Sequence, residues 1–195
     1  MSDYTPPLRD IAFLLDHVTP LTGLTALEAY AAIDRESIDG VLEEFGRLMA
    51  DVWAPTNATG DQEGSHVEGD TVRTATGHKE AYAAYREAGG GAVPFEEAYG
   101  GGGFPWLVGI VMQELLNSAN MALAMAPLLT QGAIDAILHH GSEEQKETYL
   151  LKMVSGEWTG TMNLTEPDAG SDVGALRTKA VPQGDGSYRI SGQKI

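Results

Sequence analysis

Residues 106–140 constrain the fold more strongly than any other part of the chain. Helix-forming residues run through this segment almost without a break, and apolar side chains such as Met112, Leu115 and Leu116 stand on all its faces. A helix that is apolar all round is usually buried among other helices. The segment therefore predicts a helical bundle, with residues 106–140 in its middle.

Shorter segments with a helical apolar period surround this central one. Apolar residues recur every three or four positions in residues 8–18, 25–53 and 79–88, and this period predicts helices, the second with a break near residues 34–37. Pro55 is expected to end the second of these helices, because proline cannot continue one. Residues 56–76 are mainly Gly, Asp, Glu, Thr and Asn without an apolar period, which predicts a long exposed loop.

Two helix starts carry the signature of a capping box, a hydroxyl residue followed three positions later by Glu or Gln. Thr25 and Glu28 form the first pair, and Ser142 and Gln145 form the second. Just before the second pair stand His139 and His140, which point about 100° apart on a helix and so cannot share a metal ion. We interpret the two histidines as caps of a helix C-terminus, and no metal site is predicted.

The sequence pattern changes from helical to β near residue 157. Residues 158–165 alternate and are rich in threonine, residues 188–195 alternate again, and residues 177–181 supply a possible strand between them. This β part is too short to close a sheet of its own, and the chain stops in the middle of a predicted strand. We therefore expect a fragment with a mainly α fold that ends in the first strands of a β domain.

Charge and composition exclude several classes of function. Twelve Lys and Arg against 28 Asp and Glu give a net charge of −16, which repels nucleic acid and anionic membranes. With no cysteine, the chain cannot form disulfides, thiolate metal sites or a cysteine nucleophile. No signal peptide is recognisable, and no stretch is expected to reach the roughly 18 apolar residues of a membrane helix. A cytoplasmic protein is the prediction.

One segment offers a site for a ligand. Residues 164–174 read as a strand that delivers Thr165 into a sharp turn of proline and glycines, which leaves backbone N–H groups and the Thr165 and Ser171 hydroxyls without strand partners. Such a turn can bind a polar planar ring or a pyrophosphate without positive charge. The alternative is a β-turn whose Asp and Ser residues cap their own backbone. The residues alone leave both interpretations open.

The same segment resembles the signature of the acyl-CoA dehydrogenase family, an apolar residue followed by Thr-Glu-Pro-x-Ala-Gly-Ser-Asp. The resemblance extends over residues 90–195 and includes the Tyr-Gly-Gly turn at 99–101 and the strand residues 190–195. Residues 4–55 are similar to the additional N-terminal helices of a larger subgroup, among them the methylthiopropanoyl-CoA dehydrogenases. The implied domains are an N-terminal extension (1–55), a helical N-terminal domain (56–157) and the start of a middle β-barrel (158–195).

The resemblance implies an FAD-dependent enzyme that dehydrogenates an acyl-CoA thioester between its α and β carbons. The catalytic glutamate of the family comes from a C-terminal helical bundle, so no catalytic residue is assigned here, Glu166 is expected to brace the turn, and the chain alone is expected to be inactive. Residues implied to line the flavin are Met162, Asn163, Leu164, Thr165, Gly170 and Ser171.

Substrate contacts are predicted at two places. The resemblance places Ser171 between flavin and CoA. Small residues and adaptable methionines on the central helix, namely Met121, Ala122 and Met125, are expected to form part of the acyl-tail wall, although plain helix packing explains them equally well. An electron-transfer flavoprotein as acceptor and a homodimer or homotetramer are also implied. An acyl-CoA oxidase and a non-catalytic helical binding module are the alternatives.

Overall fold

The computed structural model describes residues 3–195. The chain divides into two compact units, of which the first ends at Gly160 and the second is Thr161–Ile195. The first unit is helical apart from one small hairpin, and the second contains a two-stranded sheet. The mainly α fold class predicted from the sequence is confirmed.

The helices at the N-terminal end follow the predicted period, and the break predicted near residues 34–37 is present at Asp34. α1 (Leu8–His17) is as expected, whereas residues 25–53 form a short turn of helix, then α3 (Arg35–Leu48) and the π-helical turn η2 (Met49–Trp53). Asp34 caps α3, because its Oδ1 accepts the Ser37 N–H at 2.8 Å. The capping box predicted at Thr25 is wrong. Thr25 is the last residue of α2 (Leu21–Thr25), and its hydroxyl donates to the Leu21 carbonyl.

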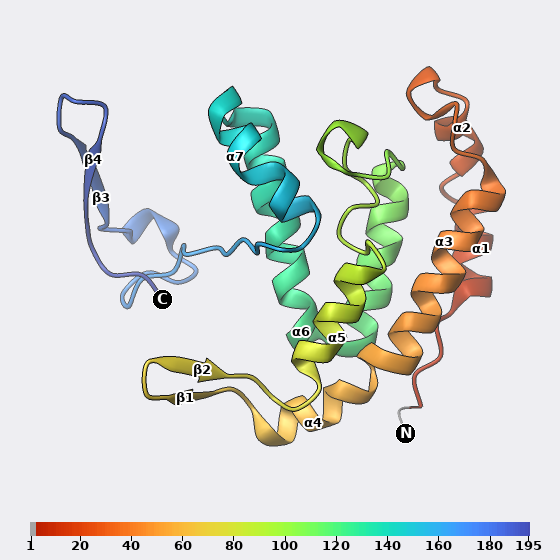
Figure 1. Cartoon of the computed structure of the whole chain (residues 1–195), viewed down its shortest axis with the longest axis horizontal. Helices are drawn as coiled ribbons and strands as arrows, with labels where there is room; N and C mark the ends of the chain where they lie inside the picture. The colour runs from red at the N-terminus through yellow and green to blue at the C-terminus, as the bar shows by residue number, and fades with distance from the viewer. Residues whose placement is uncertain (1–2) are drawn as a thin grey trace. The chain divides into compact units, whose positions relative to one another are not determined.

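Pro55 begins a helix where the sequence pattern predicted an end. It is the first residue of α4 (Pro55–Glu63). A backbone N–H at that position has no partner within the helix, so the lack of one in proline breaks no helical hydrogen bond. The predicted loop over 56–76 is therefore wrong. After α4 the chain forms an antiparallel hairpin of β1 (His66–Glu68) and β2 (Thr71–Arg73), which projects beyond the helices in Figure 1. α5 (His78–Glu87) follows, as predicted.

The central segment folds back on itself. Residues Trp106–His140 were expected to be almost unbroken helix and form α6, but Asn120 has an extended backbone (φ −159°, ψ 94°) that divides α6 into two halves. Gln113 Nε2 donates to Gln131 Oε1 at 2.6 Å, although 18 residues of straight helix would separate the two residues by about 27 Å. The two halves therefore lie side by side, as Figure 1 shows.

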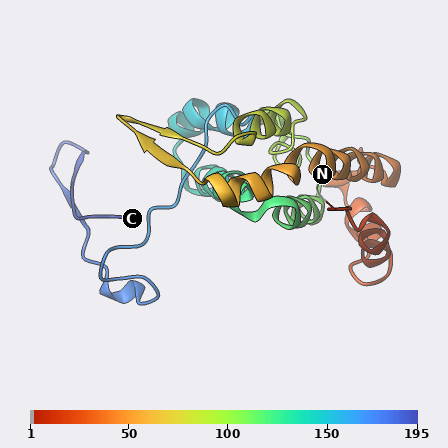
Figure 2. The same ribbon diagram turned by 90° about the horizontal axis from the view of Figure 1, so that it is seen from below.

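By length and composition alone, α6 is apolar enough to cross a membrane, so the expectation that no stretch would meet this criterion needs correction. A long core helix meets the same criterion. Here the first half of α6 supplies the centre of the hydrophobic core, in which Leu115 and Leu116 pack with Ile38, Met49 and Trp53 from α3 and η2. In both views α4 lies beside α6 (Figure 1 and Figure 2).

α7 (Glu143–Val154) begins where the sequence predicted. The Ser142 hydroxyl accepts the Gln145 N–H, and the Gln145 side chain accepts the Ser142 N–H, so the predicted capping box is present. Leu150 of α7 is fully buried and packs with Ile134 of α6 and with Phe95 in a smaller hydrophobic cluster.

In the second unit, β3 (Lys179–Pro182) and β4 (Tyr188–Ser191) pair antiparallel, with Ala180 opposite Ile190. Both predicted strand regions are therefore present in part. The strand predicted over 158–165 does not form. An alternating sequence needs a neighbouring backbone to pair with, and within residues 3–195 no strand lies beside this segment.

Candidate functional site

The segment from Leu164 to Thr178 forms an exposed turn that is closed at its base. Glu166 and Ala169 exchange two backbone hydrogen bonds of 3.0 Å each, so Pro167 and Asp168 stand at the corner. Beyond the corner, the Asp172 carboxylate accepts the Gly174 N–H at 3.1 Å and holds a single helical turn. The sequence therefore folds locally as its Pro, Gly and Asp residues predict.

The Glu166 carboxylate is the internal brace of this turn. It accepts the backbone N–H groups of Arg177 and Thr178 at 2.8 and 3.0 Å, and it lies 2.9 Å from Lys194 Nζ. Hydrogen bonds from Thr178 and Arg177, together with the Lys194 ammonium, lower the pKa of Glu166 to about 2. The residue is therefore ionised and hydrogen-bonded at neutral pH, which suits the bracing role expected for it. The low pKa also makes it a poor proton acceptor.

The end of the chain contributes two further bonds, which the sequence did not reveal. Lys194 Nζ donates to the Leu164 carbonyl at 2.9 Å as well as to Glu166, and the Ile195 N–H donates to the Thr165 carbonyl at 2.9 Å. The backbone carbonyls of Leu164 and Thr165 therefore already accept hydrogen bonds from within the chain. Their side chains face solvent, since both residues are exposed.

Two hydroxyls of the turn are free to bind a ligand. Within residues 3–195, the hydroxyls of Thr165 and Ser171 have no hydrogen-bond partner, whereas the Asn163 amide oxygen accepts from the Thr161 hydroxyl at 2.9 Å. Met162 and Leu164 are exposed, at 64% and 45%, beside these hydroxyls. An added Cβ at Gly170 would meet nothing within 4 Å, so the backbone there is open to an approaching molecule.

Free hydroxyls next to exposed apolar side chains fit a ligand that is planar, apolar on its faces and polar at its edges. An isoalloxazine ring has this chemistry. The donor set of the turn is thus compatible with the flavin that the resemblance implies, although the assignment of Met162, Asn163, Leu164, Thr165, Gly170 and Ser171 to that role stays a prediction.

The residues predicted for the acyl-tail wall lie on α6, just after its bend. Met121 and Met125 are exposed, at 62% and 44%, and Ala122 is exposed between them. Ala119 and Ala124, by contrast, are buried in the hydrophobic core. The small residues of this stretch therefore serve two purposes, because Ala119 and Ala124 permit close helix packing while Ala122 leaves an open surface.

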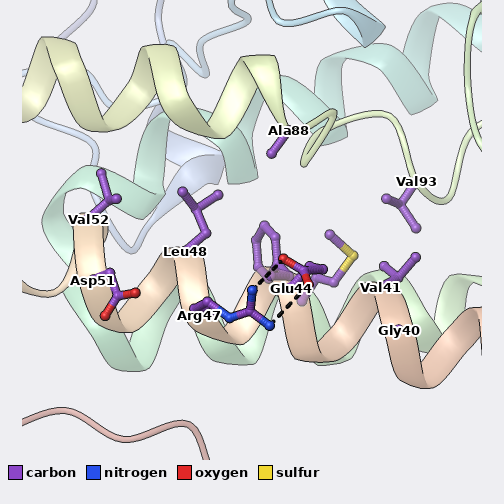
Figure 3. Close-up of a pocket in the computed structure, with 11 residues that line it drawn as sticks. Gly40, Val41, Glu44, Arg47, Leu48, Asp51, Val52, Ala88 and Val93 are labelled. Atoms are coloured by element: carbon purple, nitrogen blue, oxygen red, sulfur yellow. Dashed lines mark hydrogen bonds and ion pairs between the residues drawn. The ribbon is translucent and has the colours of Figure 1, made fainter.

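Ala122 also borders a groove of about 530 Å³ whose opposite wall is α4 and the start of α5, including Asn57, Gly60 and His78. A second groove of about 510 Å³ lies between α3 and the end of α5, with apolar walls that include Phe45, Leu48 and Met112. Figure 3 shows the Glu44–Arg47 ion pair at its rim. None of the predicted site residues lines this second groove.

Asn120 and Thr56 are buried polar residues that sequence analysis missed. A single Asn within a long apolar helical pattern was the available signal, because Asn favours helix caps over helix interiors. Its Oδ1 accepts the Leu123 N–H at 3.1 Å, and its Nδ2 donates to Thr56 Oγ1 at 2.9 Å. Asn120 thus acts as the N-cap of the second half of α6.

Comparison with known proteins gives a consistent result. The sequence profile described as "Acyl-CoA dehydrogenase, N-terminal domain" matches residues 41–157. The chain is 44% identical over 192 residues to 3-methylmercaptopropionyl-CoA dehydrogenase from Ruegeria pomeroyi, a match that covers 98% of this chain and 33% of the relative. The chain spans about a third of the length of the curated relatives it matches.

Solved structures agree. The butyryl-CoA dehydrogenase of Megasphaera elsdenii superposes with a TM-score of 0.68 at 29% identity, covering 81% of this chain and 39% of the other. A structure described as the electron transferring flavoprotein of Acidaminococcus fermentans has a TM-score of 0.66 at 27% identity, covering 84% of this chain and 40% of the other. Neither the oxidase nor the non-catalytic module is favoured by these matches.

Proposed function

This chain belongs to the acyl-CoA dehydrogenase family, and we propose that it is the N-terminal part of an FAD-dependent enzyme that dehydrogenates an acyl-CoA thioester between Cα and Cβ. The observation that carries the proposal is the braced turn at 164–178. Its backbone is held by Glu166 and Lys194, while the Thr165 and Ser171 hydroxyls stay free and exposed.

In this function the turn binds the flavin. The Thr165 hydroxyl donates a hydrogen bond to the polar edge of the ring, Leu164 and Gly170 contact it through their backbone, and Met162 covers its apolar surface. Bound FAD supplies the acceptor for the hydride that leaves Cβ. Ser171 lies farther along the turn and is assigned to both the cofactor and the CoA moiety.

The base that removes the α proton is assigned to the part of the protein outside this chain. Glu166, the acid next to Thr165 in sequence, already accepts three hydrogen bonds, and its pKa is lowered to about 2. A general base works best with a pKa near the operating pH. We therefore expect the 195 residues alone to turn over no acyl-CoA. We also expect them to bind no FAD tightly, because the flavin site of the family is shared with parts of the protein outside this chain.

The acyl chain is assigned to α6. Met121, Ala122 and Met125 form an exposed apolar strip after the bend, and flexible methionines adapt to a flexible chain. An electron-transfer flavoprotein is the proposed acceptor, in line with the solved structure described above. A homodimer or homotetramer and a cytoplasmic location complete the proposal.

The decisive experiment uses the full-length protein that contains this chain. We expect a yellow protein that absorbs near 450 nm and reduces an artificial acceptor when an acyl-CoA is added. Oxygen consumption without an acceptor would instead indicate an oxidase. A colourless protein that binds no FAD when reconstituted would refute the proposed function.

A further inference from the structure

The bend of α6 is held by side chains that come from far away in the sequence. Trp53 Nε1 donates to the Asn120 carbonyl at 3.4 Å, and Asn120 Nδ2 donates to Thr56 Oγ1 at 2.9 Å. The Thr56 hydroxyl in turn donates to the Trp53 carbonyl at 2.6 Å. Trp53, Thr56 and Asn120 are all at least nine-tenths buried. Every polar side-chain atom of these three residues therefore has a hydrogen-bond partner inside the protein.

The network determines where the second half of α6 begins. Asn120 Oδ1 accepts the Leu123 N–H, so the position of the Asn120 side chain fixes the first turn of that half. The side chain is itself oriented by Thr56, because an amide held at both its oxygen and its nitrogen has one orientation. Thr56 therefore contacts Asn120, and Asn120 caps the first turn of the second half. A single residue, Asn120, links Thr56 to that turn.

Met121, Ala122 and Met125 belong to that first turn or follow it directly. Ala122 also faces α4 across the groove of about 530 Å³, in which Asn57 stands next to Thr56 in sequence. A shift of the bend would move Met121 and Ala122 relative to the rest of the unit, since no turn of regular helix separates them from Asn120.

We propose that Thr56, acting through Asn120, is a positioning residue that sets the acyl chain-length preference of the enzyme. The proposal rests on the function proposed above and assigns no contact between Thr56 and the substrate. It predicts that specificity depends on a hydroxyl that the substrate does not touch.

Thr56→Val in the full-length protein tests this inference, because it removes the hydroxyl and keeps the shape of the side chain. We expect the ratio of kcat/KM for a long and a short acyl-CoA to change roughly tenfold, which is the usual weight of a methylene in an apolar pocket. FAD content should stay as in the wild type. Thr56→Ser, which keeps the hydroxyl, should retain the wild-type ratio.

Thr59→Val is the matched control. Thr59 stands on the same helix, α4, half-buried, and its hydroxyl has no partner within the described residues 3–195. Its substitution should leave the ratio unchanged. If Thr56→Val fails to fold, Asn120→Asp replaces it, because the carboxylate keeps the cap for Leu123 but loses the amide donor to Thr56.

An unchanged ratio in a folded, FAD-replete Thr56→Val or Asn120→Asp protein would overturn the inference. An equally large change of the kcat/KM ratio in Thr56→Ser or Thr59→Val would overturn it too. The hydrogen bond between Thr56 and Asn120 would then not be the cause of the change. Failure of the proposed function is distinguishable, because the wild-type protein would then dehydrogenate no acyl-CoA of any length.

Discussion

The ionised state of Glu166 makes a prediction about the turn at low pH. The ordinary pKa of a glutamate is 4.5, and in the folded turn that of Glu166 is lowered to about 2. A carboxylate whose pKa is lower in the folded state contributes stability above its ordinary pKa and loses that contribution as the pH falls. We therefore expect the turn to be intact above about pH 4.5 and to open progressively between pH 4.5 and pH 2.

Nuclear magnetic resonance can follow both halves of this prediction. The side-chain carboxyl carbon of Glu166 should titrate with a midpoint near pH 2. The amide protons of Arg177 and Thr178, which donate to that carboxylate, should lose protection from exchange over the same range. Glu166→Gln should show faster exchange of both amides already at pH 7, because the charged acceptor and the partner of Lys194 are gone.

Asp168→Asn is the matched control for Glu166→Gln. Asp168 is exposed and lies 3.5 Å from the exposed Arg177 guanidinium, an arrangement that contributes little to stability. Its substitution should leave the Arg177 and Thr178 amides protected. A midpoint for Glu166 near 4.5, or equal exchange in both variants, would refute the view that Glu166 braces the turn.

Three further predictions address the cofactor turn and α6. Thr165→Val removes a hydroxyl and almost no volume, so FAD binding to the full-length protein should weaken by roughly 0.5–1.5 kcal/mol; unchanged affinity and spectrum, measured by titration, would remove Thr165 from the site. Asn120→Ala removes a buried cap and should destabilise the protein by about 1–2 kcal/mol in urea unfolding, and a loss below about 0.5 kcal/mol would contradict the role given to the bend. Ala122→Leu should shift substrate preference toward shorter acyl chains, whereas an unaltered chain-length profile in a folded protein would count against the acyl-tail wall.

Much of the site could be predicted because its signals are local. The turn at 165–174 depends on Pro, Gly and Asp residues that act on their own neighbours, and the bracing role of Glu166 followed from its place in the motif. The lowered pKa of Glu166 could not be predicted, since its donors Arg177, Thr178 and Lys194 are 11 to 28 residues away along the chain.

Elements whose stabilising contacts are short in range could be predicted from the amino-acid sequence alone. α1 and α5 follow from their apolar period, and α7 follows from its capping box, because residues three and four positions apart meet on one helical face. The strand regions of β3 and β4 were predicted from the sequence in part, whereas their antiparallel pairing is seen only in the structure.

Features that depend on contacts between distant parts of the chain could not be predicted in this way. An apolar pattern could not show that α6 reverses at Asn120, because that reversal is held by Trp53 and Thr56, more than 60 residues earlier. The same contacts make residues 55–63 a helix instead of a loop, since Thr56 is buried against α6. Residues 158–165 show the converse, because a strand pattern forms no strand until another backbone lies beside it to accept and donate its hydrogen bonds.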